Sequence, residues 1–398
     1  GNTAGTSMQE SVQAEPRLDL RLSDNWQATV SARIRLDFAN ELEPGRAPVT
    51  TYSDISRPAV IDDLGTLELR DAYLERSWAN TRLRIGKQQI VWGRLDGIKV
   101  LDVLNPQDFR EFILEDFGDS RIGLWSAYLD ATHGNWRFEL AAIADNTGHA
   151  VPNSGAWFEL SAPRYRYGAD PGSPALPVTT DRGSLGVDSG ALGGRLSYSF
   201  ASTDVSFVAY SGLDHEPLGR VRTAVNGPVV ERFYERREVY GLSVETASGP
   251  FAFRAELAHQ PDRAFNTRDL AGLYTVDRDQ QRAALGIDVD GPWDTFINVQ
   301  YLYDHVRNAP DTLVRPSTDR ITTVFLRRSF AYDALEFTVR WYYSGELGDR
   351  MLSFGLGYEL SDNTELRLSA DNFSGNAEGP FGQFADRDRV TVSLAHTF

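Results

Sequence analysis

Cysteine is absent from the 398 residues, and only two methionines are present. Without cysteine the chain cannot form disulfide bonds, thiolate zinc sites, iron–sulfur clusters or covalent haem attachments. No stretch approaches the roughly 18 to 20 consecutive apolar residues that a membrane-spanning helix needs. Excess positive charge is also lacking. The 40 basic and 56 acidic residues give a formal charge of −16, which argues against a nucleic-acid partner.

What the sequence does contain is alternation with period two in nearly every segment of about ten residues. In VSARIRLDF, residues 30–38, the apolar side chains share one face, and Arg33, Arg35 and Asp37 share the other. MLSFGLGYEL (351–360) and ALEFTVRWYY (334–343) divide in the same way. Helical periodicity is scarce. The pattern therefore predicts an all-β fold with one apolar and one charged face.

Turn spacing indicates which all-β fold this is. Short polar turns such as SDN, HGN and YDA alternate with long connections rich in Gly, Pro and Asp. Four tryptophans, at positions 26, 78, 136 and 293, lie within about three residues of a short turn, where an interfacial girdle of a barrel would fall. This order is typical of an outer-membrane β-barrel with short periplasmic turns and long extracellular loops.

We therefore predict a transmembrane antiparallel β-barrel of 16 to 18 strands, with 18 favoured, in the outer membrane of a Gram-negative bacterium. About 17 strands are visible, and bacterial barrels usually have an even number. Residues 1–14 are predicted to be an N-terminal segment or a partial first strand, and residues 15–398 a single barrel domain. The expected surroundings are outer-membrane lipids and lipopolysaccharide.

Charged residues of both signs fall on the face that would line the lumen. One interpretation is a network of cross-strand ion pairs that stiffens the wall. The other is an arginine ladder that biases which solutes pass. The predicted lumen-lining residues are Arg33, Arg35, Asp37, Arg82, Arg84, Arg137, Glu139, Arg254, Glu256 and Arg340.

The long connection over residues 94–120 carries a helical pattern. Asn105 suits a helix N-cap and Pro106 the first helical position, and apolar residues then recur at helical spacing before Gly118. We predict a short helix that folds inward as a plug or constriction. A hydrophobic ligand site formed with Trp92, Leu101 and Trp125 is the alternative. The residues assigned to the plug or to ligand contact are Trp92, Leu101, Asn105, Pro106, Phe109, Phe112, Ile113, Phe117 and Trp125.

The stretch from Gly86 to Trp125 resembles an uncharacterised, porin-like family of proteobacterial outer-membrane proteins, known as a domain of unknown function. The matching residues include Gly86, Gln88, Trp92 and Gly93, followed by Asn105 and Pro106. The resemblance implies a role in moving hydrophobic molecules. It also implies possible partners, namely an inner-membrane exporter and a periplasmic lipid-handling protein, and it supplies no catalytic residues.

The last residues, VTVSLAHTF, resemble the C-terminal signature that the barrel-assembly machinery recognises. Val390, Val392, Leu394 and Phe398 are predicted to face lipid on the closing strand, with the C-terminus at the periplasmic side. We expect no catalytic, metal-binding or cofactor-binding site. The predicted function is a porin-like channel for small solutes. The alternatives are a transporter for hydrophobic or lipid-like molecules and a structural barrel without transport.

Overall fold

The chain folds almost entirely into β-strands. The computed structural model describes residues 10–40, 51–61, 64–115, 118–170, 173, 176–181, 183, 190–225, 227–268 and 275–398. Within these ranges the single helical segment is the 3-10 turn η2, Gly382–Phe384. No helix in the described ranges is both long and apolar enough to cross a membrane. The all-β prediction is confirmed.

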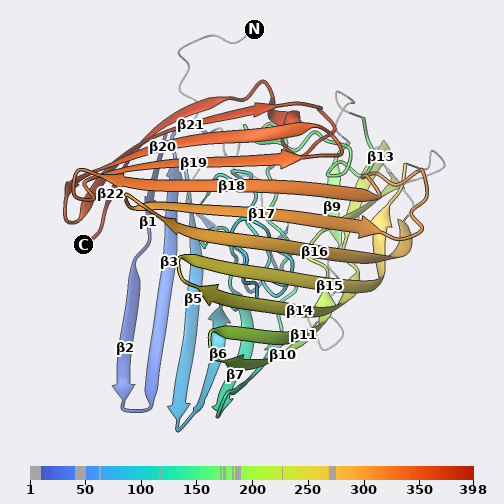
Figure 1. The fold of residues 1–398 in the computed structure, drawn as a ribbon. Helices are drawn as coiled ribbons and strands as arrows, with labels where there is room; N and C mark the ends of the chain where they lie inside the picture. The colour runs from blue at the N-terminus through green and yellow to red at the C-terminus, as the bar shows by residue number, and fades with distance from the viewer. Residues whose placement is uncertain are drawn as a thin grey trace.

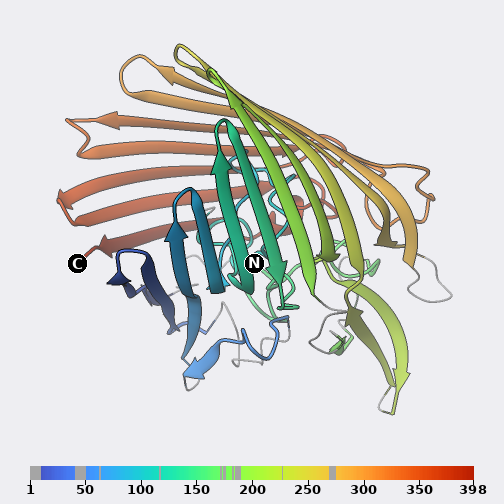
Figure 2. The ribbon, with the colours of Figure 1, turned by 90° about the horizontal axis from the view of Figure 1, so that it is seen from below.

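Nineteen strands form one antiparallel sheet, which is strongly curved, and we call the space on its concave side the lumen (Figures 1 and 2). In chain order the strands are β1 Ser11–Ala14, β2 Arg17–Ser23, β3 Trp26–Asp37, β4 Ala59–Ile61, β5 Gly65–Trp78, β6 Thr81–Gln88, β7 Leu124–His133, β8 Trp136–Ile143, β10 Ala191–Phe200, β11 Thr203–Leu213, β14 Arg236–Ser248, β15 Phe251–Asn266, β16 Thr275–Gly291, β17 Thr295–Val306, β18 Thr318–Phe330, β19 Leu335–Ser344, β20 Asp349–Ser361, β21 Thr364–Ser374 and β22 Arg389–His396. A separate three-stranded sheet combines β12 Leu218–Ala224 with β13 Gly227–Phe233 and β9 Val178–Asp181.

The nineteen strands fill fewer than nineteen positions across the sheet, because two of them lie end to end with another strand along a shared neighbour. β1 and β2 both pair with β3, one with each half, and the break between them falls at Pro16, which has no N–H to donate. β4 likewise lies beside β5 on the side that β6 occupies further along. In the described part of the chain the sheet is therefore seventeen positions wide, within the predicted range of 16 to 18 and one below the favoured 18. β1 also shows that residues 11–14 belong to the sheet.

Short turns alternate with long connections, as the sequence predicts. The short turns lie between β2 and β3, β5 and β6, β7 and β8, and so on to β20 and β21. Several contain residues with positive φ, among them Gly134, Ala201 and Gly249, which is the backbone geometry that tight hairpins require. One end of the sheet thus carries only compact turns, and the long connections gather at the other end.

The two faces of the sheet differ as the alternation predicts, with polar side chains inside and apolar side chains outside. On β3, Arg33 is 2% exposed, whereas outward-facing Val30 is 45% exposed. On β8, Glu139 is buried between the exposed Phe138 and Leu140. All ten predicted lumen-lining residues are buried or half-buried. The apolar outer face is the reverse of what a water-soluble sheet presents.

The two edges of the sheet lie on the same side of the molecule in both views (Figures 1 and 2). Among the described residues, β22 pairs only with β21, and β1 and β2 pair only with β3. A shared carboxylate links these edges instead. Glu111 lies 3.8 Å from Arg35 on β3 and 3.3 Å from Arg389 on β22. The side chains of Val390, Val392, Leu394 and Phe398 are all exposed.

Candidate functional site

The connection between β6 and β7, residues 89–123, lies inside the lumen, and we call it the inner loop (Figure 1). The predicted helix is wrong, because the described residues of this loop form turns and isolated bridges. Gln107 bridges to Arg121, and Asp108 bridges to Ala150 in another connection. Phe112 has a φ of +56°, which an α-helix cannot accommodate. Phe117 lies outside the described residues.

Asn105 is buried and does not cap a helix. Its side-chain oxygen accepts a hydrogen bond from the backbone N–H of Ile90, 2.8 Å away, and its side-chain nitrogen donates to the carbonyl of Ile122 at 2.7 Å. The carbonyl of Pro106 accepts a hydrogen bond from Ile122 as well. Asn105 therefore ties the middle of the inner loop to both of its ends.

We expect Asn105→Ala to destabilise the fold by about 3 kcal/mol, since it leaves buried backbone groups of Ile90 and Ile122 without their partner. Thermal unfolding of the detergent-solubilised protein measures the change. Asn80→Ala, in an exposed turn between β5 and β6, is the control and should leave the melting temperature near that of the original chain. An unchanged melting temperature for Asn105→Ala would contradict this role.

An apolar core fixes the root of the inner loop to the wall. Trp92, Leu95 and Leu101 are buried there against small inward-facing residues. A Cβ atom at Gly193 would lie 2.7 Å from the Trp92 ring, and one at Gly241 would lie 2.2 Å from Leu101. Glycine at these wall positions is what lets the large side chains approach the sheet.

Polar contacts reinforce this attachment. Glu256 on β15 is fully buried and accepts hydrogen bonds from the backbone N–H groups of Arg94 and Leu101. The side-chain amide of Gln300 on β17 donates to the carbonyl of Asp96. Glu256 is one of the predicted lumen-lining residues, and the structure uses it to hold the inner loop.

The far end of the inner loop reaches the opposite wall. Phe112 packs in a second apolar core, its ring 4.9 Å from that of Phe384 and 6.0 Å from that of Phe381. Arg35 on β3 pairs with Glu115 of the loop. The loop thus spans the lumen between two packed ends. Phe381 and Phe384 belong to the connection between β21 and β22, and sequence reasoning missed them although FGQF is an aromatic motif in a polar connection.

Predicted contact residues of the loop are not gathered around one cavity. Trp92 and Leu101 are each 0% exposed in the root core. Trp125 is the second residue of β7, and its indole N–H donates to the carbonyl of Ile55, 3.0 Å away. Phe109, which packs against His149, borders the cavity described next together with Phe112 and Ile113. The hydrophobic site expected from Trp92, Leu101 and Trp125 together is therefore not what the structure assembles.

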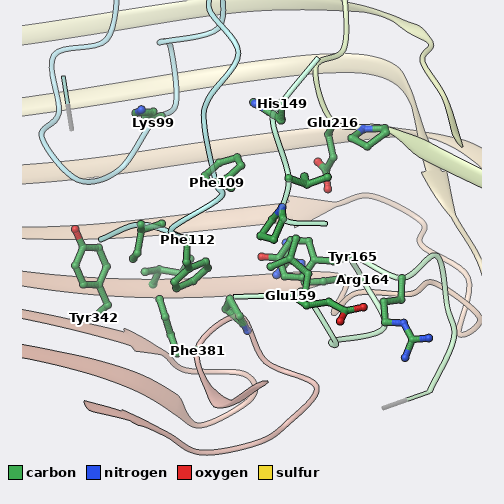
Figure 3. Close-up of a pocket in the computed structure, with 18 of the residues that line it drawn as sticks. Lys99, Phe109, Phe112, His149, Glu159, Arg164, Tyr165, Glu216, Tyr342 and Phe381 are labelled. Atoms are coloured by element: carbon green, nitrogen blue, oxygen red, sulfur yellow. The ribbon is translucent and has the colours of Figure 1, made fainter. Parts of the chain in front are cut away.

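A cavity of about 1630 Å³ lies between the inner loop and strands β17 to β19, and we call it the passage (Figure 3). Near the short turns it is lined by Phe296 and Phe325. Leu302 and Ile321 line it further along β17 and β18, toward the long connections. It continues between the long connections, where Arg164 is among its lining residues. The passage therefore follows the wall from the short-turn end to the long-connection end.

One close approach brings the inner loop against the wall of the passage. Gly97 of the inner loop faces Tyr342 of β19, and a Cβ atom at Gly97 would lie 3.2 Å from the Tyr342 hydroxyl oxygen. Gly97 also has a φ of +91°, a conformation that favours glycine. Tyr342 stands near Phe112 and Phe381 in Figure 3. Sequence reasoning did not identify Tyr342 as a site residue, because Tyr342 contacts a loop residue 245 positions away.

Lys99 is the cation that the inner loop places on the passage (Figure 3). Its ammonium donates to the side chains of Gln107 and Ser120. Burial is the main cause that lowers the pKa of Lys99 to about 7. The Asp102 carboxylate acts to raise this pKa, and the Arg121 guanidinium acts to lower it further. Its charge therefore changes close to neutral pH.

Because Lys99 loses its charge as pH rises, we expect the passage to become less selective for anions. Below pH 7 Lys99 is protonated and adds a positive charge to the passage, and above pH 7 that charge is lost. We expect the reversal potential in a KCl gradient to indicate more anion preference at pH 6 than at pH 8. Lys99→Gln should remove most of this difference. The same pH dependence in Lys99→Gln would assign it to another group.

Two histidines fix the neighbouring connections. The Nδ1 of His149 accepts a hydrogen bond from the backbone N–H of Gln107, and the ring nitrogens of His215 lie 3.0 Å from the carbonyl of Leu104 and 3.1 Å from that of Thr147. Burial lowers the pKa of His215 to about 4 and places the pKa of His149 well below its usual range. Burial therefore favours the neutral form of both rings, and a neutral His215 has one N–H to donate to its two neighbouring carbonyls.

Comparison with known proteins gives a family and a fold. Residues 3–398 match the family described as Protein of unknown function (DUF1302), and no curated protein matches the sequence. The chain is similar to OccAB3 of Acinetobacter baumannii, with 10% identity and a TM-score of 0.51 over 98% of this chain and 92% of that one. OccAB2 of the same organism has 12% identity and a TM-score of 0.49, covering 96% and 90%. OpdK of Pseudomonas aeruginosa, solved with vanillate, has 11% identity and a TM-score of 0.48, covering 97% and 91%.

The structural likeness to OccAB3 shows a shared fold and carries no statement about cargo. The porin-like family predicted from the stretch around residues 86–125 is confirmed, and the match extends over nearly the whole chain.

Proposed function

We infer the function of this chain from its passage, since the chain belongs to the DUF1302 family, a family described only as proteins of unknown function. The apolar outer face supports a place in the outer membrane, where lipid and lipopolysaccharide would cover exposed side chains such as Leu257 and Leu285. β22 ends beside the short turn before Thr364. Its C-terminus would therefore lie at the periplasmic side, and its exposed Val390, Val392, Leu394 and Phe398 suit contact with lipid and with the barrel-assembly machinery.

The proposed function is passive passage of small solutes through a lumen that the inner loop narrows. The observation that carries this proposal is the passage itself, a cavity of about 1630 Å³ that follows β17 from Phe296 to the long connections. The inner loop is held at both ends, so it narrows the lumen without filling it. A closed structural barrel would not need such a cavity along its height.

Single-channel conductance of the purified protein in a planar bilayer tests this proposal. We expect steady current in KCl, together with swelling of proteoliposomes in small neutral sugars. The channel proposal fails if a correctly folded, heat-modifiable protein gives neither current nor swelling. That result would favour the structural barrel without transport.

A second candidate is passage of hydrophobic or lipid-like molecules, and the lining of the passage favours it. Lumen-facing positions of a water-filled barrel are usually polar. Here Phe296 and Phe325 face inward with ring centroids 6.2 Å apart, and Leu302 and Ile321 extend the apolar strip toward the long connections. An inner-membrane exporter and a periplasmic lipid-handling protein would be the partners of such a transporter.

The two candidates differ in how they respond to loss of the apolar strip. Phe325→Ser should leave sugar-driven swelling unchanged and reduce binding of the fluorescent apolar probe N-phenyl-1-naphthylamine if the cargo is hydrophobic. Phe330→Ser, at an exposed position of the same strand, is the matched control. Equal probe binding by all three proteins would remove the support for hydrophobic cargo.

A further inference from the structure

A second cavity, of about 330 Å³, lies on the other side of the inner loop from the passage, and we call it the basic pocket. Residues 89–91 and Gly93 of the loop line one side of it, and strands β6, β7, β8 and β10 line the rest. Its arginines are Arg82, Arg84, Arg94, Arg137 and Arg195, and Glu139 is its acidic residue.

The basic pocket lies near the short-turn end of the sheet. Arg82 is the second residue of β6, directly after the turn that follows Trp78, and Arg137 is the second residue of β8. The inner loop lies between this pocket and the long connections. A solute would therefore reach it from the short-turn side, which the proposed orientation assigns to the periplasm.

Positive charge exceeds negative charge around the pocket. Asp130 pairs with both Arg82 and Arg137, at 2.7 and 2.9 Å. Glu139 lies 3.5 Å from Arg137 and 3.6 Å from Arg195. The two remaining arginines each have one partner, Glu75 for Arg84 and Glu245 for Arg94. Five guanidinium groups thus share four carboxylates.

Hydrogen-bonding capacity also remains unused within the described residues. The side chain of Arg195 is 4% exposed, and its Nε atom lies 3.6 Å from a Glu139 carboxylate oxygen, too far for a hydrogen bond. The Nε atom of Arg82 is buried without a partner as well. Buried donors are almost always satisfied by protein, water or ligand. These two donors beside one cavity are what a bound oxyanion would satisfy.

The chemistry of the lining selects the class of ligand. Guanidinium groups bind carboxylate and phosphate oxygens through paired N–H donors. Apolar contact is limited to Ile90, Val91 and the ring of Tyr128, in contrast to the apolar strip of the passage. We propose that the basic pocket binds a small phosphate- or carboxylate-bearing anion on the short-turn side of the inner loop.

A chain of ion pairs connects this site with the passage. Arg94, at the pocket, pairs with Glu245, which also pairs with Arg254 at 3.1 Å. Arg254 in turn lies 3.7 Å from Asp96, which lines the passage. An anion in the basic pocket would compete with Glu245 for Arg94, and so would weaken the first ion pair of this chain. Binding itself does not depend on conduction, so it is tested separately from the proposed channel.

Isothermal titration of the intact protein in detergent, with inorganic phosphate in dilute chloride buffer at pH 7.5, tests the proposal. We expect saturable binding at one site. Arg137→Gln, whose side chain is 40% exposed, and Arg195→Gln should each weaken it at least about tenfold, because paired N–H donors to the anion are lost. Arg327→Gln is the matched control, since Arg327 pairs with Glu336 away from the pocket.

Two further measurements make the result decisive. Thermal unfolding identifies any variant that fails to fold. If Arg195→Gln, at a buried position, fails to fold, Arg137→Gln alone tests the pocket. Titration with dioctanoyl phosphatidate distinguishes a lipid headgroup from a free anion as the source of the phosphate, and loss of either binding in Arg137→Gln supports the site. The proposal is overturned if neither probe binds saturably, or if binding is equal in the original protein and in both pocket variants.

Discussion

Replacing residues 96–119 with a short Gly–Ser linker is expected to raise single-channel conductance on the order of tenfold, because pore diameter controls flux. The replacement removes the segment that crosses the lumen from Leu101 in the root core to Phe112 in the far core. It leaves Trp92 and Leu95 to cover the wall. Planar-bilayer recording measures the change, and heat-modifiable migration confirms that the variant has folded.

A milder change should act in the same direction. Glu256→Ala removes the acceptor for the backbone N–H groups of Arg94 and Leu101 while keeping the whole loop. We expect noisier and larger openings from it than from the original chain. Glu238→Ala, which removes an exposed carboxylate on β14 that accepts a hydrogen bond from Tyr240, is the control. If the linker variant and Glu256→Ala both conduct like the original protein, the current does not pass the inner loop.

Gly97→Trp is expected to lower conductance on the order of tenfold, since it places a large side chain in the passage that Gly97 lines. Even a Cβ atom at Gly97 would lie 3.2 Å from the Tyr342 hydroxyl, so an indole cannot fit between the two residues and must project into the passage beside them. Tyr342→Ala should change conductance in the opposite direction. Both are read in the same planar-bilayer recordings.

Backbone strain alone must be separated from blockage. Gly134 also has a positive φ, +58°, and nothing lies within 4 Å of its Cβ position, so Gly134→Trp carries similar strain in open space. It should conduct like the original protein. If Gly97→Trp conducts normally while folding normally, solutes do not use the part of the passage that Gly97 and Tyr342 line.

The wall of this protein could be predicted from its sequence because strand pairing follows local patterns. Alternation assigned Arg33, Arg35 and Glu139 to the inner face, and each is buried there. Hairpin turns fixed the neighbours of most strands. Closure by the last strand depends on pairing between distant parts of the chain, and in the described residues the edges meet through Glu111.

The inner loop could not be predicted in the same way, because its conformation depends on partners far away in sequence. Asn105 and Pro106 have the chemistry of a helix start, yet the carboxamide of Asn105 holds Ile90 and Ile122. Glu256 was predicted only as a lumen-lining carboxylate. Its side chain accepts a hydrogen bond from the backbone N–H of Leu101, which lies 155 positions earlier in the sequence. Glycines at inward wall positions, such as Gly193, were the available signal, since they mark where another segment approaches.

The central claim is that solutes move through the passage between the inner loop and β17 to β19, and a single introduced thiol tests it most directly. The chain has no cysteine, so Thr323→Cys places one thiol on the passage. Thr322→Cys places one on the opposite face of the same strand. A charged methanethiosulfonate reagent should reduce the current through Thr323→Cys and leave that through Thr322→Cys unchanged. Current that is unaffected at position 323, with the modification confirmed by mass spectrometry, would contradict the passage as the route.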